Sequence, residues 1–172
     1  MASYERGLAA ARNALKSVPA HTFRITKDGP PVVPSDPYDD YSVHWELRIE
    51  PARSSACPLE LWFATSARDS EDTLCCGFGF DSWQEIAARL GLKTGTGFRF
   101  AFGIEPIHVT ESQIERVIGA TVAGQAEVRV LSVLGRVWFV NGRLRSDIGL
   151  EAVSRKALSL GRLHIYEPYL DA

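Results

Sequence analysis

Hydrophobic and polar residues alternate along residues 41–50 more regularly than anywhere else in the chain. Apolar side chains occupy Tyr41, Val43, Trp45, Leu47 and Ile49, and polar side chains occupy the positions between them. A period of two residues is typical of a β-strand with one buried face and one solvated face. We therefore predict a strand over residues 41–50 that buries its apolar face, including Trp45.

The same alternation predicts further strands in shorter runs. Gly135 is expected in the turn between two of them, and Asn141-Gly142 is a strong signal for a two-residue turn. Short connections of this kind join antiparallel neighbours. The additional predicted strands cover residues 23–25, 59–63, 73–80, 98–102, 126–134, 136–140 and 163–166.

Four segments carry the hydrophobic period and the end signals of α-helices. Ser3 is expected to cap the first helix. Ser82 and Thr110 begin the second and third with the spacing of a capping box, and Asp147 opens the fourth. The predicted helices cover residues 3–16, 82–91, 110–124 and 147–161.

The order of these elements indicates the fold class. Strands and helices do not alternate regularly, and the sequence contains no internal repeat or low-complexity segment. This arrangement favours an α+β fold, in which a largely antiparallel sheet packs against three or four helices, over a doubly wound fold. The chain of 172 residues fits a single domain, 1–172, which can bury about 70% of the surface exposed when unfolded.

Charge is distributed unevenly along the chain, although the net charge is only −2. Residues 28–72 contain ten acidic side chains and three arginines. Residues 129–162 contain six arginines and one lysine against two acidic side chains. Because the field of many side chains adds, two such regions attract partners of opposite charge.

Composition argues against several classes of protein. No segment approaches the 18 to 20 apolar residues needed to span a bilayer, so we expect no membrane association. Cys57, Cys75 and Cys76 make an odd count and a poor disulfide framework, which favours a cytoplasmic location. The histidines are scattered singly and the cysteines lack paired spacing, so neither a metal site nor a cofactor is predicted.

One pair of residues suggests catalysis. His44 and Glu46 are predicted on the polar face of the same strand, where they would form a base and its orienting carboxylate. No recognisable nucleophile or third ligand lies nearby in the sequence, so the interpretation leans away from an enzyme. The alternative hypothesis is a small enzyme or ligand-binding protein, with a pocket between the phenylalanine-rich sheet and its helices that uses His44, Glu46 or His108.

Nucleic-acid binding is not expected. Residues 76–80, Cys-Gly-Phe-Gly-Phe, partly resemble the aromatic strand of an RNA-recognition motif. The basic residue that leads that motif is missing, and Glu71 and Asp72 precede the segment. Because phosphate affinity needs clustered positive charge, we interpret these rings as part of the core.

The leading hypothesis rests on the acidic loop before the first regular strand. Residues 28–40 contain four prolines and four aspartates, a composition of restricted backbone and clustered carboxylates. Proline lowers the ordering cost of binding, tyrosine supplies contact area and carboxylates steer a basic partner. We predict a small cytoplasmic protein-binding module, of the inhibitor or immunity type, that engages a basic protein; the sequence does not indicate its oligomeric state. The predicted partner-binding residues are Asp36, Tyr38, Asp39, Asp40, Tyr41, His44 and Glu46.

Overall fold

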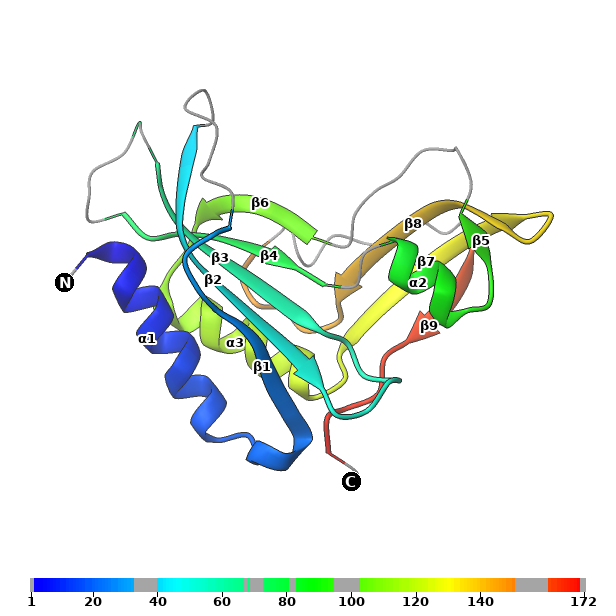
Figure 1. Ribbon diagram of the computed structural model, residues 1–172, viewed down its shortest axis with the longest axis horizontal. Coiled ribbons are helices and arrows are strands. Elements are labelled where there is room, and N and C mark those ends of the chain that lie inside the picture. The colour runs from blue at the N-terminus through cyan, green and yellow to red at the C-terminus, as the bar shows by residue number, and fades with distance from the viewer. Residues whose placement is uncertain are drawn as a thin grey trace.

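A computed structural model describes residues 2–32, 40–66, 68, 73–80, 83–94, 103–150 and 161–170 of the chain. These residues form three α-helices, one short 3₁₀ turn (Ala20–Thr22) and nine strands arranged in two sheets (Figure 1). The predicted α+β class with an antiparallel sheet is confirmed. The presence of a second sheet is a feature that the sequence did not reveal.

The first sheet has five strands in the order β1-β2-β3-β4-β6, and every neighbouring pair is antiparallel. Its side chains alternate as expected: Leu47, Leu61 and Phe78 are fully buried on one face. The strands are β1 (Phe23–Gly29), β2 (Tyr41–Pro51), β3 (Leu59–Ser66), β4 (Cys75–Gly79) and β6 (Gly103–His108).

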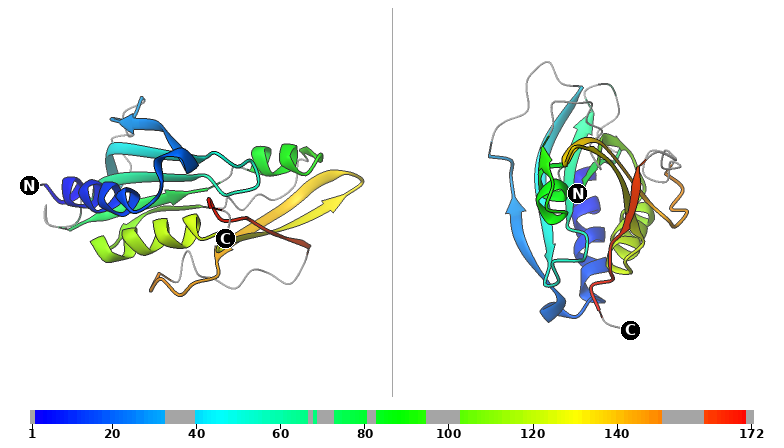
Figure 2. Two further views of the ribbon diagram at one scale, coloured as in Figure 1. Left: turned by 90° about the horizontal axis from the view of Figure 1, so that it is seen from below. Right: turned by 90° about the vertical axis from the view of Figure 1, so that its right-hand side faces the viewer.

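Helix α1 (Ser3–Lys16) packs against the buried face of this sheet, and α3 (Glu111–Val122) packs against α1 on the same side (Figure 2). Gly7 brings α1 close to the sheet. A Cβ atom at this position would lie 2.7 Å from Leu74 Cδ1 and 3.0 Å from Phe63 Cδ1. The close approach therefore depends on the absence of a side chain at residue 7.

One of the two described helix caps follows the sequence prediction. Thr110 caps α3: its hydroxyl accepts from the Gln113 backbone N–H at 3.3 Å, and its own N–H donates to the Gln113 side chain at 2.8 Å. The prediction for Ser3 is wrong, because Ser3 is the first helical residue and Ala2 is the N-cap. The Ala2 backbone N–H instead donates to the Glu5 carboxylate at 2.9 Å.

The second sheet has the order β5-β8-β7-β9, with β5 parallel to β8 and the other pairs antiparallel. The β7–β8 hairpin turns at Leu134 and Gly135, whose φ angles are 50° and 73°, and it projects from the body of the molecule (Figures 1 and 2). Beside it lies α2 (Trp83–Arg89). The strands are β5 (Lys93–Thr94), β7 (Ala126–Val133), β8 (Arg136–Leu144) and β9 (Arg162–Ile165).

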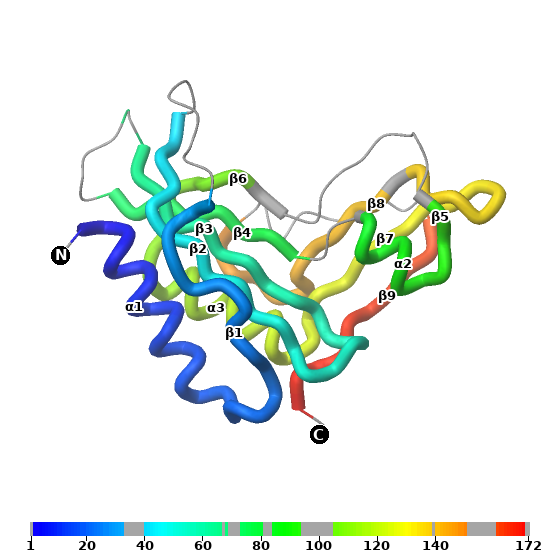
Figure 3. The backbone as a smooth tube through the Cα atoms, viewed as in Figure 1, coloured from blue at the N-terminus to red at the C-terminus, as the bar shows by residue number. Residues whose placement is uncertain are grey.

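The chain passes between the two sheets more than once (Figure 3). After β4 it forms α2 and β5 next to the second sheet, and it then returns as β6 at the edge of the first sheet. Beyond β9 it comes back again, where the Tyr169 hydroxyl donates to the Cys57 carbonyl at 2.7 Å. Buried apolar residues of both sheets and of the helices accordingly belong to one hydrophobic cluster.

Several predicted elements need correction. Asn141 and Gly142 are not a turn, because they lie within β8 opposite Arg129 and Val128. The predicted strand at 98–102 lies outside the described residues, and the fifth strand of the first sheet is β6. Pro106 argues against a strand in the sequence, because proline cannot donate a hydrogen bond to a neighbouring strand. It is tolerated here because β6 lies at the edge of the sheet.

The predicted C-terminal helix is not seen in the part of it that the structure describes. Residues 147–150 are not helical, and residues 151–160 lie outside the described residues. None of the helices in the described part of the chain is both long and apolar enough to cross a membrane.

Trp45 also differs from its prediction. It is half-buried, and its indole N–H donates to the Asp28 carboxylate at 2.7 Å. The Arg12 guanidinium lies 5.9 Å from the centre of its ring. A bulge between Val43 and Trp45 shifts the strand register, so regular alternation does not hold at this point.

Candidate interaction surface

The face of the first sheet that points away from α1 and α3 is not covered by any described helix (Figure 2). Residues directly opposite one another in a sheet share a face, and two rows of such residues cross its centre. Glu46 lies opposite Trp62, and Arg48 lies opposite Glu60. We call this the acidic sheet face and define it by Lys27, Glu46, Arg48, Glu50, Glu60, Trp62 and Glu85.

Trp62 lies over β4 at a point where the residues of β4 on this face are glycines. Its partner on β4 is Gly77, and the next residue of β4 on the same face is Gly79. A Cβ atom at residue 79 would lie 2.6 Å from Trp62 Cη2. The indole therefore occupies the space that a larger residue would fill, and it forms a half-buried aromatic platform on the sheet.

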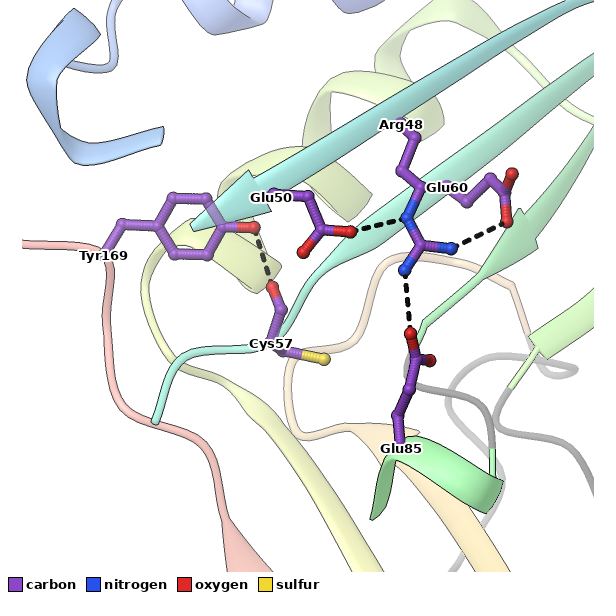
Figure 4. A network of polar contacts seen from close by, with 6 residues as sticks. All are labelled: Arg48, Glu50, Cys57, Glu60, Glu85 and Tyr169. Carbon is purple, nitrogen blue, oxygen red and sulfur yellow. Dashed lines mark hydrogen bonds and ion pairs between the residues drawn. The ribbon is translucent and has the colours of Figure 1, made fainter. Parts of the chain in front are cut away.

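Arg48 stands at the centre of the acidic sheet face among three glutamates (Figure 4). Its Nε is 2.6 Å from Glu50 Oε1, its Nη2 is 3.1 Å from Glu85 Oε1, and its Nη1 is 3.7 Å from Glu60 Oε2. Glu85 comes from α2, whereas the other residues come from β2 and β3. Three carboxylates thus share one guanidinium, and among the described residues acidic groups outnumber basic groups around it.

The pKa values of this cluster reflect that imbalance. Burial disfavours the charge on Arg48, but Glu50, Glu85 and Glu60 outweigh burial and raise its pKa. Burial also raises the pKa of Glu60, and Arg48 only partly offsets this effect. The ionised Glu60 carboxylate is consequently less well solvated than it would be in the unfolded chain.

A second ion pair borders the cluster. Lys27 Nζ lies 2.9 Å from Glu46 Oε2, and both side chains are largely withdrawn from solvent. The carboxylate of Glu46 also contributes to the raised pKa of Glu60. The charged groups of β1, β2 and β3 therefore act on one another as a single network.

The structure describes only part of the predicted acidic loop. Asp36, Tyr38 and Asp39 lie outside the described residues. Asp40 is exposed, and its carboxylate pairs with Arg68 at 2.7 Å. Tyr41 is half-buried at the start of β2, the strand that also carries Glu46 to the acidic sheet face.

His44 and Glu46 have different neighbours, whereas the catalytic alternative would need them to interact as a base and its orienting carboxylate. The His44 ring stacks on Tyr4 of α1 at 4.9 Å, and its Nε2 is 2.8 Å from Thr65 Oγ1. Glu46 pairs with Lys27 instead. The bulge next to His44 accounts for the separation, because it breaks the rule that residues two apart share a face.

His108 does not join them. It lies on β6, three strands away from β2, which corresponds to about 14 Å at the usual strand spacing. The structure therefore does not bring His44, Glu46 and His108 into one pocket. Among the described residues, no group of three or more His, Cys, Asp or Glu side chains is arranged to hold a metal ion.

Sequence reasoning missed the centre of this surface. The alternation in residues 59–63 already placed Glu60 and Trp62 on the outward face, but neither was singled out. A tryptophan at an outward strand position was the available signal. The contribution of Glu85 was not readable, because it depends on where α2 lies in the fold.

No family model, curated protein or solved structure matches the chain. The chemistry of the surface itself is therefore the evidence for function. That surface combines an aromatic platform with carboxylates that outnumber the cations nearest to them. Both features favour contact with a positively charged group.

Proposed function

We propose that the protein is a binding module that engages a basic protein partner through the acidic sheet face. The observation that carries the proposal is the environment of Glu60. Its carboxylate is largely withdrawn from water, shares one guanidinium with Glu50 and Glu85, and has a raised pKa. A lysine or arginine of a partner would add counter-charge for this carboxylate, which shares Arg48 with two other glutamates among the described residues.

Trp62 complements the carboxylates. A cation placed over an indole ring gains about 0.5 to 2 kcal/mol, depending on how far it is desolvated. Tryptophan is also enriched among the few residues that dominate the affinity of protein interfaces. A basic side chain laid on Trp62 and paired with Glu60 would use both effects at once.

The acidic loop extends this surface. Asp40 precedes β2 by one residue and is six residues from Glu46, which is about 20 Å along a strand. An interface of ordinary size buries about 800 Å² per partner, so one partner can cover both regions. The proposed interface then also includes the predicted residues Asp36, Tyr38, Asp39, Asp40 and Tyr41.

An inhibitor or immunity-type role follows from this mode of binding. A module that covers the basic surface of an effector blocks access to that surface without any chemistry of its own. We place the protein in the cytoplasm, and its three buried free thiols support a reducing compartment.

The experiment begins with recovery of the partner from a lysate of the native host, followed by binding kinetics with the purified partner at two salt concentrations. We expect Glu60→Gln to slow association and flatten its salt dependence, since carboxylates steer basic partners. Trp62→Ala should accelerate dissociation about tenfold or more because it removes a contact anchor.

Two variants on other surfaces serve as matched controls. Glu111→Gln removes an exposed carboxylate from α3, and Trp138→Ala removes a partly exposed tryptophan from β8. Both should leave binding unchanged. An acidic partner, or kinetics that Glu60→Gln and Trp62→Ala do not alter, would refute the proposal. Loss of binding only in Asp39→Asn and Asp40→Asn variants would instead assign the interface to the loop.

A further inference from the structure

A small cavity lies where α2 meets the second sheet, and its lining shares no residue with the acidic sheet face. Its volume is about 200 Å³. Ile86 of α2 and Leu90, which follows α2, form one wall, and Val128 of β7 and Tyr166, which follows β9, form the other. Ile86, Val128 and Tyr166 are almost completely buried, so the walls are apolar and packed against the core.

Arg89 and His164 are among the polar side chains that line this cavity. The Arg89 guanidinium lies over the Tyr166 ring, 5.7 Å from its centre, and donates to the Ala56 carbonyl at 3.5 Å. His164 is half-buried on β9, directly opposite Val128. A cation and an imidazole therefore border the same apolar cavity.

Two arginines place positive charge near the cavity: Arg89 lines it, and Arg162 lies close to His164. Burial lowers the pKa of His164, and the nearby charge of Arg162 lowers it further. His164 is consequently neutral at pH 7, with one N–H donor and one acceptor nitrogen. Ser55 also lines the cavity. Its hydroxyl donates a hydrogen bond to the Glu167 carboxylate at 2.5 Å.

We propose that this cavity binds a small aliphatic monocarboxylate, with its carboxylate between Arg89 and His164 and its hydrocarbon chain against Ile86, Leu90 and Val128. A guanidinium donates two parallel hydrogen bonds to a planar carboxylate, and a neutral imidazole donates a further one. Apolar walls with a few convergent polar groups are typical of small-molecule sites.

The volume limits the size of the ligand. A water molecule occupies about 30 Å³ in the liquid, so the cavity holds about seven such volumes. An acid with roughly five to seven non-hydrogen atoms fills this space. Pentanoate has this size, and 1-pentanol has a chain of the same length without the charge.

The test is an NMR titration of the isotope-labelled full chain with pentanoate. We expect saturable shifts that centre on Val128, His164 and Tyr166. 1-Pentanol should bind at least tenfold more weakly, because it lacks the carboxylate that the cationic side chain recognises. Arg89→Gln should weaken pentanoate binding at least tenfold, and Arg89→Lys should retain part of the affinity because it keeps the charge.

Arg136→Gln is the matched control, since Arg136 is an exposed arginine of the second sheet that does not line this cavity. The affinity of the Arg136→Gln variant for pentanoate should equal that of the wild type. Equal binding of pentanol and pentanoate, shifts centred elsewhere, or an Arg89→Gln variant with unchanged affinity would each overturn the proposal. The comparison of pentanol with pentanoate uses the wild-type protein, so it remains decisive even if a variant fails to fold.

Discussion

Replacing Gly7 by alanine tests how closely α1 approaches the first sheet. Alanine is favoured over glycine within a helix by about 1 kcal/mol, so propensity alone predicts stabilisation. The new Cβ, however, would lie 2.7 Å from Leu74 Cδ1 and 3.0 and 3.2 Å from two atoms of the Phe63 ring. Both neighbours are buried, and overpacking of a core usually costs about 1 to 3 kcal/mol. We expect a net destabilisation of up to about 2 kcal/mol.

The same substitution at Gly119 should have the opposite effect. Gly119 is an exposed residue of α3, and a Cβ atom added there would meet nothing within 4 Å. Only the gain in helix propensity remains, so Gly119→Ala should stabilise the protein by about 0.5 to 1 kcal/mol. The pair isolates packing from propensity, because both glycines lie within α-helices.

Urea titration followed by tryptophan fluorescence measures both changes, since the chain contains four tryptophans. The two variants should have the same denaturant dependence as the wild type and differ from it in midpoint, in opposite directions. Stabilisation by Gly7→Ala comparable to that of Gly119→Ala would mean that α1 does not pack closely on Leu74 and Phe63. The assignment of the buried face of the first sheet would then be wrong.

Three further substitutions or treatments give clear expectations. Leu134 is 98% exposed and has a φ of 50°, a conformation that asparagine tolerates better than leucine, so Leu134→Asn should stabilise the protein by up to about 1 kcal/mol in the same urea assay. Cys57, Cys75 and Cys76 are buried and free, and burial raises the pKa of Cys76, so mass spectrometry should detect no alkylation in the native state and three modified thiols after unfolding. Because the pKa of Glu60 is raised in the folded state, the wild type should lose stability as the pH rises above 4.5, relative to Glu60→Gln. The two proteins should become equally stable in acid, and a wild type more stable than the variant at pH 7 would contradict the raised pKa.

The separation of charge along the sequence corresponds to a separation in the fold. Glu46, Glu50 and Glu60 belong to β2 and β3 of the first sheet, whereas arginines such as Arg129 and Arg162 belong to the second. The two proposed sites follow this division, with a basic partner at the first sheet and an anionic ligand beside the second. Each proposal can fail without affecting the other, because the two share no residue.

Local patterns predicted much of the first sheet and one of its helices well. The alternation along residues 41–50 identified β2, and the capping residues Thr110 and Gln113 marked the start of α3. These features depend on neighbours in the sequence, which is why periodicity and capping rules detect them.

Features that depend on distant residues were not predictable in this way. The bulge beside His44 changes the direction of that side chain without any signal in the alternation. The two-residue strand β5 exists because it pairs in parallel with β8, and its own sequence has no strand pattern. Likewise, the cluster around Arg48 needs Glu85, which lies 37 residues away.

The path of the chain between the sheets has a consequence for how the protein can be divided. A break between residues 94 and 103 would leave α1, β1–β4, α2 and β5 on one fragment and β6, α3 and β7–β9 on the other. Neither fragment holds a complete sheet, because the first sheet would lack β6 and the second would lack β5. Each fragment would expose apolar surface that only the other can cover, since α3 packs against α1 and the core is shared. We therefore expect the two fragments to fold only when they associate. This property would suit them as a split reporter, in which each fragment is fused to one of two proteins and folding reports that the two proteins are close together.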